Sequence, residues 1–245
     1  MITAKNITKS YGKTICLKDV SLHVDAGHAL AVAGENGAGK TTLLKILATA
    51  SVPDSGTLHI GGIDALKNAS TVRESLGYVP QGIALMQELS VRDNLYYWMK
   101  TKDEAVYETV MDIIGLKDVE KKKVARLSGG MKRRLNIGAS LVLRPSLLIL
   151  DEPLAGVDIA NRRRIIAALT ALKQSGVAII FTSHYIDEMQ MLADEMLALK
   201  EGTMTYCGPM EFENLAEAIT ALYRVKGNMP WKKNPKSLAL RRRRN

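Results

Sequence analysis

A short apolar run leads directly into a glycine-rich loop and then into a segment of helical period, and this order strongly limits the possible folds. The apolar run covers 29–33, the loop has the sequence GENGAGKT at 34–41, and a helix is predicted over 40–50. The loop fits the pattern G-x-x-x-x-G-K-[ST], which requires a preceding strand and a following helix as its context. Glycines let backbone N–H groups approach phosphate oxygens closely, and the helix start adds partial positive charge. The sequence therefore predicts a site for nucleotide phosphates.

The residue types in this loop suit a polyphosphate that carries a metal ion. Lys40 offers a positive charge to the outer phosphates, and Thr41 offers a hydroxyl ligand to Mg²⁺. A chance glycine turn before a helix is the alternative, and average residue usage produces this pattern by accident in about one chain per hundred of this length. The residues predicted to bind the nucleotide along this segment are Gly34, Glu35, Asn36, Gly37, Ala38, Gly39, Lys40, Thr41 and Thr42.

The second half of the chain alternates short apolar runs with segments of helical period, which predicts an α/β sheet with crossover helices. A helix over 160–174 has apolar residues at helical spacing, and its Arg162, Arg163 and Arg164 are expected on the opposite, solvated face. Buried strands are predicted at 147–150, 178–182 and 196–199.

The first sixty residues and the middle of the chain have different patterns. Short alternating strands at 2–7, 22–24 and 57–60 predict an antiparallel sheet that wraps the α/β core. The stretch from about 88 to 143 has almost no strand signal and predicts an inserted helical subdomain. The predicted fold class is therefore α/β, a P-loop core with an N-terminal antiparallel β subdomain and an inserted helical subdomain.

Two adjacent acids, Asp151 and Glu152, follow the buried strand at 147–150. A phosphate-binding loop needs a carboxylate on a neighbouring strand to hold Mg²⁺, and successive strand residues point in opposite directions. Asp151 is therefore predicted in the metal shell, and Glu152 is predicted to face the γ-phosphate and act as the general base. Acids at strand ends are often only the start of a loop, and this pair gains its meaning from the glycine loop.

The formal net charge of +9 is concentrated at one end of the chain. Eight lysines and arginines, and no acids, lie in 226–245, which leaves the first 225 residues nearly neutral. That balance predicts no nucleic-acid partner, which would need an excess of basic residues over a folded surface. We assign 1–225 to the nucleotide-binding domain and 226–245 to a basic, disordered tail. The tail is either a solvated end or a contact with anionic lipid, to which each base contributes about 1 kcal/mol at low salt.

No apolar run comes close to the roughly 18 residues that a membrane-spanning helix needs. The first residues also lack the basic and then apolar pattern of a signal peptide. These observations predict a cytosolic chain in which Cys16 and Cys207 are reduced thiols.

The segment LSGGM at 127–131 directly precedes a helix predicted at 132–143. Here the chain resembles the nucleotide-binding cassettes of ABC transporters, whose signature is LSGGQ, over about residues 1–220. Ser128, Gly129 and Gly130 at a helix N-terminus form a second anion site, with exposed N–H groups and a positive dipole. The resemblance implies that the bound nucleotide is ATP with Mg²⁺.

Four further positions match motifs of this family in the family's order. Tyr11 matches the aromatic that stacks on adenine, with a strand-edge aromatic as the alternative. Gln81, in YVPQ, matches the glutamine that touches Mg²⁺ and couples to the membrane partner. Asp158, in AGVD, matches the loop that crosses the dimer interface. His184, in TSH, matches the histidine that contacts the γ-phosphate, although a lone histidine is more often structural.

Two positions depart from the family pattern. Met131 replaces the usual glutamine of the signature, which puts in doubt a polar contact from that side chain to the opposite nucleotide. Glu35 stands where proline is common, and we expect its side chain to point outward. Neither change removes a residue that the chemistry needs.

The resemblance also implies how the chain works and with what partners. One chain cannot close its two half-sites on the same ATP, so two chains are expected to pair head to tail around two ATPs, and a homodimer is expected. The sequence LSGGMKRRLN, with GVD at 156–158, resembles a bacterial branch of type-two exporters of drugs, bacteriocins and polysaccharides. There the permease is a separate transmembrane subunit, which places the ATPase at the cytoplasmic face of the membrane. A stand-alone regulatory ATPase of the same class, without a membrane partner, is the alternative.

Overall fold

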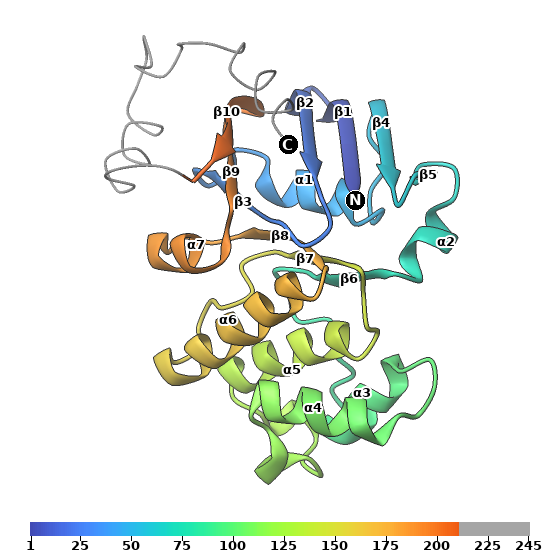
Figure 1. Cartoon of the computed structure of the whole chain (residues 1–245), viewed down its shortest axis with the longest axis vertical. Coiled ribbons are helices and arrows are strands. Elements are labelled where there is room, and N and C mark those ends of the chain that lie inside the picture. Colours follow the sequence, from blue (N-terminus) through green and yellow to red (C-terminus); the bar gives the residue numbers. More distant parts are fainter. Residues whose placement is uncertain (211–245) are drawn as a thin grey trace, which may run out of the picture. The chain divides into compact units, whose positions relative to one another are not determined.

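Two sheets organise residues 1–210, the part of the chain that the computed structural model describes (Figure 1). The larger sheet has six strands in the order β10-β9-β3-β8-β7-β6. Its first five strands along the chain are parallel, and β10 pairs antiparallel to β9. The strands are β3 (Ala29–Gly34), β6 (Leu76–Val79), β7 (Leu147–Leu150), β8 (Ala178–Thr182), β9 (Glu195–Lys200) and β10 (Thr203–Pro209).

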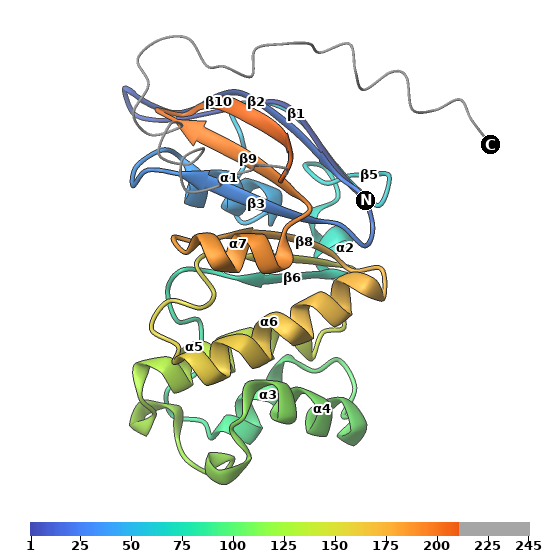
Figure 2. The same ribbon diagram turned by 60° about the vertical axis from the view of Figure 1, so that its left-hand side comes forward.

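Helices cover both faces of this sheet, which is why its central strands are apolar along their whole length. Every residue of β3, β7 and β8 is buried. Figure 2 shows α1 on one face, and α5 and α6 on the other. The covering helices are α1 (Lys40–Leu47), α5 (Gly129–Leu141), α6 (Ile159–Gln174) and α7 (Ile186–Leu192).

The smaller sheet is antiparallel and lies over α1, as predicted for the first sixty residues (Figure 2). Its strands are longer than the apolar pattern indicates, because the polar ends still pair in the hairpin of β1 and β2, for example Tyr11 with Thr14. Apolar side chains from this sheet, from α1 and from the larger sheet form one continuous core. The order is β2-β1-β4-β5, with β1 (Ile2–Tyr11), β2 (Thr14–Val24), β4 (Ser55–Ile60) and β5 (Ile63–Asp64).

The segment between β6 and β7 is helical, and its helices have well-defined starts. Ser90, Asp103 and Ser128 each accept a hydrogen bond from a backbone N–H in the first turn of the helix that follows. Such side-chain caps satisfy donors that a helix start leaves free. Because Ser128 is the cap, α5 begins at Gly129, three residues before the predicted start. The remaining helices are α2 (Ala69–Arg73), α3 (Val91–Trp98) and α4 (Glu104–Ile114), with 3₁₀ turns at Lys117–Val119 and Val124–Arg126.

The sequence predicts no membrane-spanning helix, and it predicts a basic tail after a domain boundary at 225. Within residues 1–210, none of the helices has the length and apolar character needed to span a bilayer. The basic segment 226–245, and the domain boundary predicted at 225, lie outside the described residues.

Candidate functional site

The glycine loop connects β3 to α1 and leaves backbone N–H groups free for an anion. No side chain caps α1, and its first turn contains no acidic residue. Gly39 has a φ of 102°, and a Cβ there would lie 2.5 Å from the carbonyl oxygen of Cys16, so only glycine fits. The loop can therefore hold phosphate at a helix start that nothing else occupies.

Lys40 lies across this loop. Its Nζ donates to the carbonyl oxygens of Gly34 at 2.6 Å and Glu35 at 3.0 Å, and the residue is 7% exposed. Burial lowers the pKa of Lys40, and the nearby carboxylates of Glu152 and Asp151 oppose that shift. The carbonyl oxygens of Gly34 and Glu35 thus hold the ammonium in the loop.

A cavity of about 480 Å³ opens above the loop and brings distant parts of the chain together. Gln81, from the segment after β6, faces the loop together with Glu152, after β7, and His184, after β8. Each of these follows the carboxyl end of a parallel strand, where ligands bind in open α/β sheets. The lining residues are Cys16, Asn36, Gly37, Gly39, Lys40, Thr41, Thr42, Gln81, Glu152 and His184.

Asp151 and Glu152 have different surroundings, although they are neighbours. Asp151 is 1% exposed, and its Oδ1 accepts from Thr182 Oγ1 at 2.8 Å, whereas its Oδ2 is buried without a hydrogen-bond partner. Glu152 has a φ of 49°, and its Oε1 lies 2.9 Å from His184 Nε2. Buried polar atoms almost always have a hydrogen-bond partner or a ligand, and the described residues provide none for Asp151 Oδ2.

That orphan oxygen and its neighbours fit a magnesium ion. Asp151 does not line the cavity, but its charge acts on Lys40, and Lys40 lines the cavity together with Thr41 and Gln81. Carboxylate, hydroxyl and amide oxygens are the hard donors that Mg²⁺ takes. Within residues 1–210 there is no cluster of three or more histidines, cysteines and acids that could hold a metal alone. Mg²⁺ is commonly bound by one or two carboxylates together with substrate phosphates.

The other predicted residues do not line this cavity. Tyr11 is 51% exposed at the end of β1, with Lys9 Nζ 5.5 Å from the centre of its ring. Glu35 is exposed, as expected, whereas Gly34 and Ala38 are buried in the loop. Ser128, Gly129 and Gly130 start α5, and Asp158 caps α6.

The starts of α5 and α6 nevertheless lie against each other. A Cβ on Gly130 would lie 2.9 Å from the carbonyl oxygen of Gly156, so the two loops pack through backbone. Asp158 accepts from the backbone N–H of Asn161 at 3.0 Å. The signature segment and the Asp158 loop therefore form one surface, apart from the cavity above the glycine loop.

Sequence reasoning missed three residues of this site. Cys16 lines the cavity from β2, and Thr182 Oγ1 bridges Asp151 and the backbone N–H of Glu152. A polar residue at the end of the buried strand β8 was an available signal for Thr182. Arg133 is 4% exposed in α5, and its guanidinium donates to the carbonyl oxygens of Pro80, Gln81, Asp151, Glu152 and Pro153.

The prediction that three arginines lie on the solvated face of α6 is wrong for one of them. Arg163 and Arg164 are exposed, but Arg162 turns inward to pair with Glu188 in α7. The sequence places Arg162 on the polar side of the helix, and only the packing of α7 there makes that side an interior contact.

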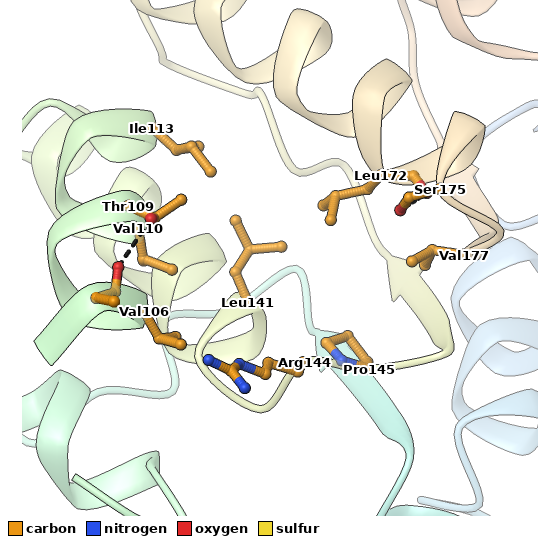
Figure 3. A pocket seen from close by; sticks show the side chains of 11 residues that line it. Val106, Thr109, Val110, Ile113, Leu141, Arg144, Pro145, Leu172, Ser175 and Val177 are labelled. Carbon is orange, nitrogen blue, oxygen red and sulfur yellow. Dashed lines mark hydrogen bonds between the residues drawn. The ribbon is translucent and has the colours of Figure 1, made fainter. Parts of the chain in front are cut away.

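A second cavity, of about 400 Å³, contains none of the predicted site residues (Figure 3). Its lining is mainly apolar and comes from α4 and from the ends of α5 and α6, as Val110, Leu141 and Leu172 illustrate. Its polar lining residues are Thr109, Arg144 and Ser175, and it contains neither the glycine loop nor a carboxylate.

Comparison with known proteins identifies the family of the chain. The profile of the ABC transporter family matches residues 17–155. The chain is 37% identical over 214 residues to the linearmycin resistance ATP-binding protein of Bacillus subtilis, covering 85% of this chain and 69% of that protein. It is 34% identical over 237 residues to a daunorubicin resistance ATP-binding protein of Streptomyces coeruleorubidus, covering 93% and 75%. It is 37% identical to a Nod factor export ATP-binding protein of Mesorhizobium japonicum, covering 80% and 59%.

Solved structures agree with the fold. The structure of an ATP-binding subunit of an ABC transporter superposes with a TM-score of 0.85 at 25% identity, covering 91% of this chain and 100% of that chain. A dimeric ATP-binding cassette in a post-hydrolysis state, bound to ADP and Pi, superposes with a TM-score of 0.79 at 22% identity, covering 86% and 100%. The chain is an ATP-binding domain of the ABC transporter family.

Proposed function

We propose that this chain hydrolyses ATP as the motor subunit of an exporter and acts on a separate transmembrane permease. The observation that carries the proposal is the cavity in which Lys40, Gln81, Glu152 and His184 meet above an uncapped helix start. Phosphoryl transfer requires positioning and charge stabilisation around the phosphates, together with a group that orients the attacking water. This cavity contains all of these groups.

Each side chain has a defined part in the proposed hydrolysis. Lys40 and the N–H groups of α1 bind the phosphates, and Glu152 accepts a proton from the attacking water as general base. His184 holds the Glu152 carboxylate through the 2.9 Å contact and reaches the γ-phosphate with its ring. Tyr11, from β1, stacks on the adenine outside the cavity.

Asp151, Thr41 and Gln81 are the residues that would hold Mg²⁺. The buried, unpartnered Oδ2 of Asp151 supports this assignment. When bound, the ion neutralises negative charge on the transferring phosphate.

The second half-site requires a second copy of the chain. Ser128, Gly129 and Gly130 offer N–H groups at the start of α5 but do not line the cavity of their own chain. In a head-to-tail dimer they bind the ATP held by the partner's phosphate loop, and Asp158 lies at the interface. ATP then joins the two chains, and its hydrolysis releases them.

The permease is proposed to dock on an apolar groove of about 330 Å³ between β6, α3 and α5. Tyr78 and Ala84 line this groove on either side of Gln81 in sequence, and Trp98 lines it from α3 with 39% of its surface exposed. A cytoplasmic helix of the permease seated here would touch the segment that carries Gln81. The chain would then work at the cytoplasmic face of the membrane.

Export of a drug, a peptide or another amphiphile is the proposed direction and cargo class. Two of the relatives above are named for drug resistance and one for Nod factor export. A stand-alone regulatory ATPase is the competing function, and the test below separates the two.

The experiment is phosphate release by the purified full chain with ATP and Mg²⁺, with and without a candidate permease subunit. We expect hydrolysis that a Mg²⁺ chelator abolishes, that Lys40→Ala abolishes through loss of ATP binding, and that the permease alters. Micromolar ATP binding by Lys40→Ala would refute the phosphate loop. Hydrolysis with no response to the permease, and no complex with it, would favour the regulatory ATPase.

The basic segment 226–245 is proposed to contact anionic lipid beside the permease. It has eight bases and no acids, and clusters of this kind bind anionic headgroups in a salt-dependent way. Deleting 226–245 should abolish binding to phosphatidylglycerol vesicles at low salt. Equal binding with and without the segment would refute the proposal and leave a solvated end.

A further inference from the structure

Arg162 connects the Asp158 loop to the segment around His184. It lies in the first turn of α6, and its Nη2 donates to the carbonyl oxygen of Val157 at 3.3 Å. Its guanidinium carbon lies 4.3 Å from the centre of the Tyr185 ring. One side chain thus contacts the residues directly before Asp158 and directly after His184.

Glu188, in α7, pairs with this arginine and also bonds to the residue before His184. It is 4% exposed, and its Oε1 lies 3.2 Å from Arg162 Nε. Its Oε2 accepts from the hydroxyl of Ser183, and that hydroxyl accepts from the backbone N–H of Tyr185 at 3.0 Å. The carboxylate therefore holds both neighbours of His184 in the chain.

The ion pair is buried but lacks full hydrogen-bond geometry. Arg162 Nε and Glu188 Oε1 are both inaccessible, and neither makes a hydrogen bond among the described residues. Burial raises the pKa of Glu188, while Ser183 and Arg162 oppose that shift. A buried polar pair that is incompletely satisfied is sensitive to small displacements, because a low dielectric strengthens its electrostatic interaction.

The first turn of α6 is tied to the signature helix as well. Asn161 Oδ1 accepts from Arg134 Nη1 in α5 at 3.1 Å, and Asn161 also bonds to Asp158. On the proposed function, α5 and Asp158 serve the ATP of the partner chain, whereas His184 serves the chain's own ATP. Arg162 and Glu188 therefore form one set of contacts between the two ATP sites within one chain.

We propose that Arg162 and Glu188 are positioning residues that transmit the position of the Asp158 loop to His184. Closure of the dimer against Asp158 moves the start of α6, and the ion pair carries that movement to the backbone on both sides of His184. The inference rests on the proposed function, because it assigns the interface to Asp158 and hydrolysis to the site of His184.

The test uses the full chain with Glu188→Gln, Arg162→Lys, and the double variant Arg162→Met with Glu188→Gln. Glu188→Gln keeps the shape and an acceptor for Ser183, and the double variant leaves no unpaired buried charge, so both should fold. Arg163→Met is the matched control, since Arg163 is the exposed neighbour on the same helix. The readouts are the Kd for ATP, kcat, and the ring NMR signals of His184, assigned with His184→Gln.

We expect the Kd for ATP to stay within about twofold, and kcat to fall about 10- to 100-fold in the double variant, the usual effect of a misplaced catalytic group. The NMR signals of His184 should shift in Glu188→Gln and in the double variant. Arg162→Lys should have a higher kcat than the double variant, because it keeps a positive charge beside Glu188.

Two results would overturn the inference while the proposed function stands. One is a kcat equal to that of Arg163→Met. The other is a lower kcat with unchanged His184 signals, because the effect would then not pass through His184. If the wild-type chain does not hydrolyse ATP, the proposed function fails instead, and the His184 signals still test the contact.

Discussion

Replacing Glu152 with glutamine tests the general base without disturbing the loop that carries it. Glutamine has nearly the same size, and its amide can keep the contact that Glu152 Oε1 makes with His184 Nε2 at 2.9 Å. The bond from the backbone N–H of residue 152 to Thr182 Oγ1, at 2.8 Å, does not depend on the side chain. We therefore expect the free energy of unfolding to change by about 1 kcal/mol or less.

The rate of hydrolysis should change far more than the affinity for ATP. A positioned general base contributes about 10²- to 10⁴-fold in rate, which corresponds to about 2.7 to 5.4 kcal/mol of activation free energy at 1.36 kcal/mol per tenfold. ATP binding depends on the glycine loop and Lys40, which the variant retains. Because the variant loses one negative charge beside the phosphates, its Kd for ATP should be equal to or lower than that of the wild type.

The assay is steady-state phosphate release at saturating ATP, combined with size-exclusion chromatography in ATP and Mg²⁺. We expect a kcat at least about 100-fold lower and a dimer that persists because its ATP is not hydrolysed. Glu74→Gln is the matched control, since Glu74 is an exposed acid outside the site. A kcat within about twofold of the wild type would show that Glu152 is not the base.

Three further predictions use backbone geometry and charge. Glu152→Gly should be about 1 kcal/mol more stable than Glu152→Ala in urea unfolding, because the φ of 49° favours glycine, and equal stabilities would contradict this reasoning. Gly130→Ala should destabilise the fold by about 1–3 kcal/mol, since its Cβ would meet the carbonyl oxygen of Gly156 at 2.9 Å, whereas Gly129→Ala has open space and should not. Burial lowers the pKa of Lys40, so between that pKa and 10.5 the folded chain binds fewer protons than the unfolded chain. The stability of the nucleotide-free protein should therefore rise with pH across that window, and Lys40→Met should lack the rise in urea unfolding.

The parts of the site that are contiguous in sequence could be predicted from the sequence. The loop from Gly34 to Thr41 binds through its own backbone, so residue types and spacing are sufficient evidence. Strands β7 and β8 have the predicted bounds because a continuous apolar run that ends in polar residues marks a buried parallel strand. The family resemblance supplied Gln81, Asp158 and His184.

Contacts between segments distant in sequence could not be predicted. Cys16 enters the cavity because β2 passes beside the glycine loop, where its carbonyl oxygen excludes any side chain at Gly39. Arg133 donates to the carbonyl oxygens of Gln81, after β6, and of Asp151, after β7. A sequence motif gives no sign of which side chain a backbone carbonyl will accept from.

The sequence by itself determined the buried strands β3, β7 and β8, the phosphate loop and the two acids after β7. These features follow from local periodicity and from the few residue types that tolerate the required backbone. Only the tertiary structure decided that Asp151 Oδ2 has no partner and that Arg162 turns inward to Glu188. Burial and pairing depend on which elements pack together, and the pattern within one element does not contain that information.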